Sequence, residues 1–171
     1  PTVTTKPPLL SPRVERLLLV PLFALPVLWL AGYFFPPLNH DVAAILDVSA
    51  RWIGGETLYV QVIDENLPLT FIVHGLPVLT AKLLHGTIAF WFTAWVVAGI
   101  AASFYACRRL VRLVPSADHA LTEALLPPVL LFLFTVLPNE HFGQREHLMF
   151  VACAPYLIAS MARAEGVHLA R

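Results

Sequence analysis

Two long apolar runs without a single charged side chain limit what this chain can fold into. The first covers residues 17–35 and the second covers residues 87–107. Each is close to the roughly 20 residues that an α-helix needs to cross the hydrocarbon core of a bilayer. Only 13% of the chain is charged, against roughly a quarter of a typical soluble domain. The two runs therefore predict membrane-spanning helices.

Two shorter apolar stretches, at about residues 121–138 and 147–163, are further candidates to cross the membrane. Together the four stretches predict an all-α, polytopic membrane protein whose transmembrane domain covers residues 17–163. A fifth stretch, residues 67–84, is broken by polar residues, glycine and proline. We expect it to form a helix at the outer surface of the membrane rather than a span.

The distribution of Lys and Arg predicts the orientation of these helices. With four spans and a cytoplasmic N-terminus, the eleven cations divide into three outside and eight inside, the latter being Lys6, Arg13, Arg16, Arg108, Arg109, Arg112, Arg163 and Arg171. This excess obeys the positive-inside rule. We therefore expect a multi-pass protein of the bacterial inner membrane, with residues 1–16 and 164–171 in the cytoplasm. Residues 36–86 then form an amphipathic periplasmic loop with interfacial helices.

Composition and motifs exclude several classes of function. The chain lacks the clustered basic and aromatic residues of a nucleic-acid-binding protein. Cys107 and Cys153 form no C-x-x-C pattern, so we interpret both as small packing residues. Residues 17–35 exceed a typical signal-peptide core and are interpreted as a retained anchor. Away from their ends, the four predicted spans carry no Asp, Glu, Lys, Arg or His, which argues against a channel or transporter.

The segment after the first run predicts a short amphipathic helix at residues 40–53. Val42, Ile45 and Trp52 share one face, which we expect to lie on the membrane surface. Asn39 is suited to cap the helix and Gly54 to end it. Asp41 falls in the first turn, where the helix dipole stabilises a carboxylate. That effect alone can explain this acid, but its place beside the membrane also suits a catalytic base.

The order of motifs in residues 17–163 resembles the GT-C class of membrane glycosyltransferases, which use polyprenyl-phosphate sugars and include protein mannosyltransferases and aminoarabinose transferases. The matching features are an acid after the first span, a G-x-x-L-Y element ending at Tyr59, an N-x-P element beginning at Asn66, and Arg108-Arg109 after the second span. The chain has Leu67-Pro68 where relatives show two prolines. The resemblance implies that Asp41 is the catalytic base, that the donor is a lipid-linked sugar, and that transfer inverts the sugar.

A second polar cluster lies between the third and fourth predicted spans. Its candidate substrate-binding residues are Glu140, Arg145, Glu146 and His147, joined by Tyr59 and Asn66 from the first loop. A guanidinium offers paired donors to a departing phosphate, which suits Arg145. Alternatively, the segment is polar only because it connects two spans. A bound divalent metal ion is a third interpretation, but the spacing fixes no ligand set, so no metal site is assigned.

Members of the GT-C family that this chain resembles are several-fold longer than its 171 residues. We therefore expect either the N-terminal portion of a glycosyltransferase or a shortened relative that serves as an accessory or scaffold subunit of a membrane complex. In the second case the small residues of "AGIAAS" (98–103) would pack against helices of other subunits. In both cases the expected partners include membrane lipids.

Overall fold

The computed structural model describes residues 12–35, 38–113 and 119–166. In this part of the chain every regular element is a helix, apart from an isolated β-bridge between Leu58 and Val62. The helices follow in the order α1 (Pro12–Gly32), α2 (His40–Ile53), α3 (Pro68–Leu84), α4 (Ile88–Val111), α5 (His119–Thr135), the 3-10 turn η1 (Asn139–His141) and α6 (Arg145–Ala164). The predicted all-α fold is confirmed.

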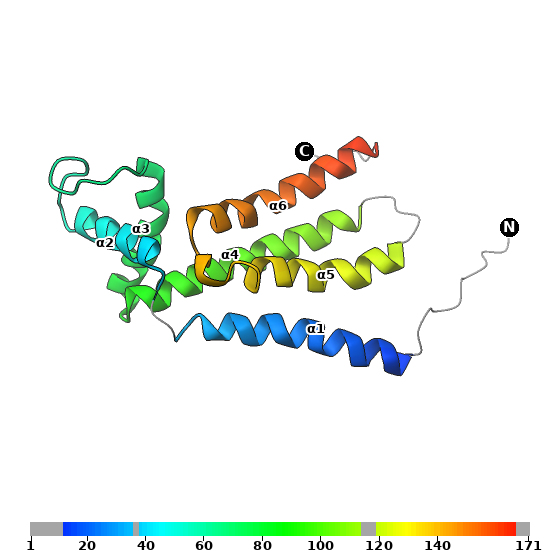
Figure 1. The fold of residues 1–171 in the computed structure, drawn as a ribbon. Helices are drawn as coiled ribbons and strands as arrows, with labels where there is room; N and C mark the ends of the chain where they lie inside the picture. The colour runs from blue at the N-terminus through cyan, green and yellow to red at the C-terminus, as the bar shows by residue number, and fades with distance from the viewer. Residues whose placement is uncertain (1–11, 36–37, 114–118, 167–171) are drawn as a thin grey trace.

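Four helices, α1, α4, α5 and α6, alternate in direction and lie side by side in an elongated bundle (Figure 1). The helices α2 and α3 pair with each other at one end of it. The segment η1 and the start of α6 lie at the same end (Figure 1). Residues on both sides of α4 in the sequence are therefore brought together at this end.

Helix α4 is the centre of the bundle, since it contacts α3, α5 and α6. The Thr87 side chain caps it by accepting a hydrogen bond from the Phe90 amide at 3.1 Å. Its buried side chains include Phe92, Val96 and Ile100. Full burial of an aliphatic or aromatic side chain contributes about 1.5–3 kcal/mol. These residues recur every three or four positions, so one face of α4 supplies much of the core.

The predicted helix at residues 40–53 is α2, with the Asn39 cap and the end at Gly54 that the sequence indicated. The prediction that the apolar face of this helix lies on the membrane surface is wrong. Val42 and Ile45 are buried inside the protein, and Ile45 packs in a cluster with Phe71 of α3. Helix α3 is itself apolar, so the two helices bury their apolar faces against each other.

Among the described residues, two helices are long and apolar enough to cross a membrane: α4, with 24 residues and a mean hydropathy of 1.7, and α6, with 20 residues and a mean hydropathy of 1.3. Shorter apolar helical segments lie at Val20–Gly32, Pro68–Leu84 and Thr122–Thr135. The predicted run at 87–107 lies almost wholly within α4, and 147–163 lies within α6. Cys107 is buried as expected, whereas Cys153 is exposed on α6.

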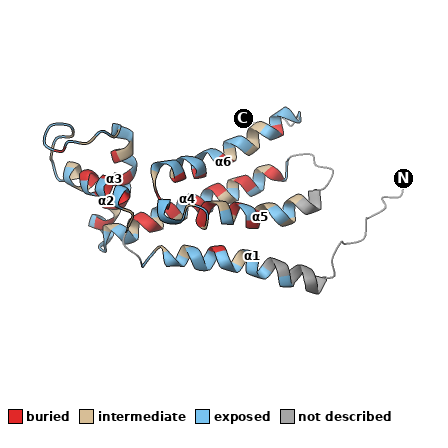
Figure 2. Cartoon of the chain, in the orientation of Figure 1, coloured by how far each residue is buried: buried red, intermediate tan, exposed pale blue. Residues whose placement is uncertain are grey.

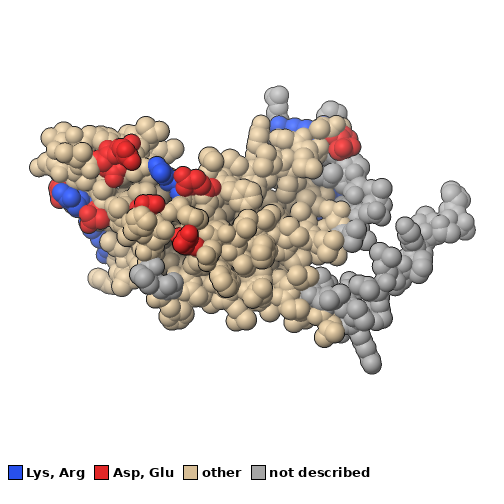
Figure 3. All heavy atoms as spheres, viewed as in Figure 1, with Lys and Arg blue, Asp and Glu red and all other residues tan. Residues whose placement is uncertain are grey.

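The surface of the bundle is apolar over most of its length. Helix α1 exposes Leu17, Leu28 and Trp29, and α6 exposes Met149 and Met161. Figure 2 shows many exposed residues along the helices, with buried residues mainly on α2, α3 and α4. In Figure 3 the charged side chains form one group toward each end, and the section of this face between the two groups carries none. The charged loops are thus separated by an uncharged belt.

Candidate functional site

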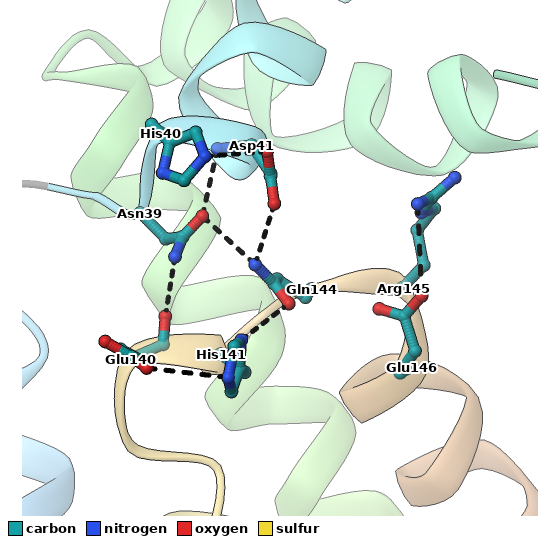
Figure 4. Close-up of polar contacts among 8 residues, drawn as sticks. All are labelled: Asn39, His40, Asp41, Glu140, His141, Gln144, Arg145 and Glu146. Atoms are coloured by element: carbon teal, nitrogen blue, oxygen red, sulfur yellow. Dashed lines mark hydrogen bonds and ion pairs between the residues drawn. The ribbon is translucent and has the colours of Figure 1, made fainter. Parts of the chain in front are cut away.

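Asn39 joins the start of α2 to the segment before α6. Its Oδ1 accepts hydrogen bonds from the Asp41 amide at 2.9 Å and from Gln144 Nε2 at 3.1 Å. Its Nδ2 donates to the Glu140 carbonyl oxygen at 3.0 Å. The residue that caps α2 therefore also binds two residues about a hundred positions further along the chain (Figure 4). We call the contact between residues 39–41 and 140–144 the interloop clasp.

The Asp41 carboxylate lies on the outer side of the clasp. One oxygen accepts a hydrogen bond from Gln144 Nε2 at 3.1 Å, and the other lies 3.1 Å from His40 Nε2. The side chain is 60% exposed, so a molecule approaching from outside can reach it. Gln144 donates to Asn39 and Asp41 together, which fixes the direction of the carboxylate (Figure 4).

Arg145 connects the start of α6 to the loop between α2 and α3. Its guanidinium donates to Asn66 Oδ1 and lies 3.9 Å from the Glu146 carboxylate. The Asn66 carbonyl oxygen accepts a hydrogen bond from the Tyr59 hydroxyl at 2.6 Å. Asp64 also holds Asn66, because Asp64 Oδ1 accepts hydrogen bonds from the backbone amide of Asn66 and from Asn66 Nδ2, each at 2.7 Å. Arg145 and Asp41 thus share one end of the molecule but have separate partners.

The segment behind the clasp is held by a close approach to α4. Gly143 has a φ of +81°, a region that glycine adopts without strain. A Cβ at this position would collide with the Phe92 ring and lie 3.6 Å from Val96 Cγ2. The neighbouring Phe142 stacks on Tyr33 with the ring centroids 3.7 Å apart. These contacts fix the position from which Gln144 and Arg145 extend.

His147 occupies the interior, although the sequence had indicated a substrate-binding role. Its exposed fraction is 6%, and Nδ1 accepts a hydrogen bond from the Gly143 amide at 2.9 Å. Since Nδ1 accepts, the ring proton is on Nε2, which donates to the Phe134 carbonyl oxygen at 2.9 Å. Both ring nitrogens are therefore engaged by the backbone, and His147 positions the loop instead of presenting a free group to a ligand.

Glu140 takes part in the clasp through its backbone, whereas its carboxylate lies 3.6 Å from His141 Nε2. Its side chain is 74% exposed. Of the residues that the sequence singled out, Asp41, Arg145, Glu146, Tyr59 and Asn66 all lie at this end with exposed or partly exposed side chains. Among the residues that the structure describes, no three His, Cys, Asp or Glu residues lie close enough together to hold a metal ion.

Two cavities border the clasp on one side. One, of about 300 Å³, is lined by Tyr33, Leu38, Asn39, Thr93, Asn139, Glu140 and Phe142. The other, of about 450 Å³, is lined by Leu25, Leu28, Trp29, Gly32, Tyr33 and Asn139. They share Tyr33 and Asn139, so polar groups of the clasp continue into an apolar groove along α1. Such an arrangement suits a molecule with a polar head and an apolar chain.

His74 lies at the buried side of this end and is 2% exposed. Its Nδ1 is 2.8 Å from the Thr70 carbonyl oxygen, which only accepts, so Nδ1 carries the proton. Nε2 has no hydrogen-bond partner among the described residues. Burial lowers the pKa of His74, the backbone bond to Thr70 opposes this, and the nearby Arg145 adds to the lowering. The neutral ring stacks on Phe92.

Sequence reasoning missed the parts played by Asn39, Gln144 and Gly143. Asn39 was recognised as a helix cap, but a cap requires only local contacts and gives no sign of a distant partner. Gln144 lies within the polar segment that the sequence had singled out, but it was given no role. For Gly143 the one available signal was the glycine itself, a residue type that often marks turns between periodic segments.

Searches of protein-family models, curated proteins and solved structures find no match to this chain. The functional interpretation therefore rests on the sequence motifs and on the geometry described above.

Proposed function

We propose that α1, α4, α5 and α6 cross the bacterial inner membrane, with the clasp on the periplasmic side. The uncharged belt supports this placement, because charged side chains inside a bilayer are costly. The end away from the clasp carries Arg108 and Arg109 in the last turn of α4 and Arg163 in that of α6. Their position agrees with the positive-inside rule.

On this placement we propose that the chain is the membrane portion of a GT-C-type glycosyltransferase. The donor is a sugar linked to a polyprenyl phosphate, and the acceptor carries a hydroxyl group on the periplasmic side. Asp41 accepts the hydroxyl proton while the acceptor oxygen bonds to the anomeric carbon. The bond from that carbon to the phosphate oxygen breaks, and the phosphate leaves with the electron pair. Attack opposite to the leaving group inverts the sugar.

The observation that supports this proposal most directly is the interloop clasp. It brings the two polar segments, 103 residues apart at Asp41 and Gln144, to one end of the bundle. Asp41 remains 60% exposed there, and its clasp neighbours Asn39 and Glu140 line the cavity that continues into an apolar groove along α1. In this proposal Arg145, which is 55% exposed at the same end of the molecule, binds the departing phosphate through its paired guanidinium donors. A general base contributes typically about 10²–10⁴-fold when its geometry is right.

The test is an Asp41→Asn variant of the full-length protein in membranes, assayed for transfer from radiolabelled polyprenyl-phosphate sugars. We expect turnover to fall by about 10²–10⁴-fold with normal membrane abundance. Asp47→Asn is the matched control, because Asp47 is an exposed acid of the same helix outside the clasp. Equal turnover in Asp41→Asn and Asp47→Asn would contradict the assignment of the base.

A second candidate function is that of an accessory subunit, favoured by an open apolar groove of about 420 Å³ between α3, α4 and α6. The α4 side of this groove carries the small residues Gly99, Ala102, Ser103 and Ala106. Small residues allow close approach of another transmembrane helix. A Cβ at Gly99 meets no atom within 4 Å, so Gly99→Leu would fill the groove without disturbing the fold. Loss of a co-purifying subunit in this variant, with Asp41→Asn retaining it, would support the accessory role.

A further inference from the structure

The end of α4 opposite the clasp carries a small basic pocket. Tyr105, Arg108, Arg109 and Arg112 line a cavity of about 170 Å³, and all four side chains are exposed. The guanidinium carbon of Arg109 lies 5.6 Å from the centroid of the Tyr105 ring, one helical turn earlier. A guanidinium over an aromatic face is attracted by the ring, so Tyr105 limits the directions that Arg109 can take.

The pocket has more positive than negative charge. Arg112 Nε lies 3.2 Å from a Glu123 carboxylate oxygen of α5. Arg108 and Arg109 have no carboxylate partner within the part of the chain that the structure describes. Among the described residues, the three guanidinium groups that line the pocket therefore have one carboxylate partner, an excess of two positive charges. The three positive charges line one cavity and repel one another, and an anion bound between them would offset this repulsion.

The chemistry and position of the pocket point to one kind of anion. Guanidinium groups match the oxygen geometry of phosphate and bind it through paired donors. The arginines of the pocket begin where the uncharged part of α4 ends. Residues 88–107 carry no charged side chain, and Arg108 is the first charged residue after them. At this boundary of the apolar helix, the phosphate of a lipid headgroup has its acyl chains beside the uncharged part of α4. The exposed Tyr105 ring can contact both the headgroup and the chains, as interfacial tyrosines do.

We infer that this pocket binds the phosphate group of an anionic membrane phospholipid. Arg108 and Arg109 supply the unpaired positive charge, Tyr105 holds Arg109 in place, and the acyl chains lie along the apolar surface of α4. The inference depends on the membrane placement and is independent of glycosyl transfer. It also assigns a use to residues that the proposed catalytic end does not involve.

The test uses the purified chain in dodecyl maltoside micelles, with bound lipid counted by native mass spectrometry. Dioctanoyl phosphatidylglycerol, dioctanoyl phosphatidylcholine and inorganic phosphate are titrated separately. We expect the anionic lipid to bind more tightly than the zwitterionic lipid of the same chain length. Inorganic phosphate should bind more weakly than the anionic lipid, because it lacks the hydrocarbon that the micelle and α4 accommodate. Equal binding of the two lipids, or phosphate binding as tightly as the anionic lipid, would overturn the inference.

Variants separate the pocket from general attraction by positive charge. Arg108→Gln combined with Arg109→Gln should weaken phosphatidylglycerol binding by roughly 30-fold, since each basic residue near an anionic lipid contributes about a fivefold factor. Arg163→Gln is the control, because Arg163 is an exposed arginine in the last turn of α6 that does not line the pocket. It should change binding by less than about twofold, as the field of one charge is screened beyond the contact distance. If Arg163→Gln and the single variant Arg108→Gln lost the same affinity for phosphatidylglycerol, binding would reflect the overall positive charge of this end of the molecule, and the pocket assignment would be overturned.

A second variant tests the role of the aromatic ring. Tyr105→Leu keeps an apolar side chain but removes the ring under Arg109, and should weaken binding of phosphatidylglycerol by about two- to fivefold. Tyr105→Phe keeps the ring and should bind as the native chain does. Tyr105, Arg108 and Arg109 are all exposed, so these changes leave the helical core intact, which circular dichroism verifies. If Tyr105→Phe lost as much affinity as Tyr105→Leu, the cation–ring contact would not be what holds Arg109.

Discussion

The two faces of the short segment from residue 139 to residue 147 differ sharply, although both are rich in polar side chains. On the inner face, Gly143 lies against Phe92, and His147 is 6% exposed with both ring nitrogens bound to backbone groups. On the outer face, Gln144 and Arg145 contact Asp41 and Asn66 of the first loop. One face holds the fold together, whereas the other presents charge to the outside.

This difference teaches that polar composition alone does not identify a site. The sequence grouped His147 with Arg145 because they are two residues apart, and the helical turn places them on different sides of α6. We therefore expect changes on the inner face to act on stability first, and changes on the outer face to act on activity with little effect on stability.

The largest effect is expected for Gly143→Ala. The new methyl group would collide with the Phe92 ring, and alanine is strained at a φ of +81°. Overpacking and left-handed strain together should cost about 3–4 kcal/mol of unfolding free energy. Gly166→Ala is the control, because Gly166 has a φ of +80° but a Cβ placed there would meet no atom within 4 Å. Denaturant unfolding in micelles measures both, and equal losses would show that Phe92 exerts no steric pressure.

His147→Leu is expected to cost about 2–3 kcal/mol. The change leaves the Gly143 amide and the Phe134 carbonyl oxygen buried without a partner, and each such group costs about 1–3 kcal/mol. His141→Leu is the matched control from the outer face, where the side chain is 63% exposed. Thermal unfolding followed by circular dichroism should separate the two variants. A similar melting temperature for both would remove the distinction between the faces.

Gln144→Ala should lower stability by at most about 1 kcal/mol, because its hydrogen bonds to Asn39 and Asp41 are partly solvated. Under the proposed function it should lower turnover more than it lowers stability, since the Asp41 carboxylate loses the donor that directs it. Gln144 then acts as a positioning residue for Asp41. The comparison requires unfolding and transfer assays on the same preparation. A stability loss well above that of His147→Leu would place Gln144 among the structural residues.

The smallest effect is expected in the pH dependence of stability, through His74. Burial lowers the pKa of His74 in the folded state below its ordinary value of 6.5. The unfolded chain then takes up a proton at a higher pH than the folded chain does, so stability is lost as the pH falls below about 6.5. His74→Phe should flatten this loss between pH 7.5 and pH 5.5, whereas the exposed His85→Asn should leave it unchanged. An unchanged slope in His74→Phe would show that other groups carry the dependence.

Much of the fold could be predicted because its causes are local. The apolar runs at 87–107 and 147–163 fall on α4 and α6, and the Asn39 cap with Gly54 bounds α2 as expected. Contact with the membrane through the apolar face of α2 was predicted wrongly, because periodicity shows that a face is apolar but not what covers it. Here α3 covers it, through Phe71 and its neighbours.

The sequence predicted which residues belong to the candidate site, but not which hydrogen bonds join them. Asp41, Arg145, Tyr59 and Asn66 are marked by chemistry and motif order, which a sequence displays directly. The hydrogen bonds from Gln144 to Asn39 and Asp41 join residues more than a hundred positions apart. Such pairs depend on how the bundle stacks, and no local pattern encodes them.

The sequence by itself determined that this chain is helical, roughly where its helices lie, and that its charges separate from a long apolar middle. Helix caps and apolar periodicity act over a few residues, so they can be recognised without knowing the fold. Only the tertiary structure decided that Gly143 lies on Phe92, that His147 faces inward, and that Asp41 remains outside. Burial depends on every neighbour that packs around a side chain, and those neighbours come from distant parts of the chain.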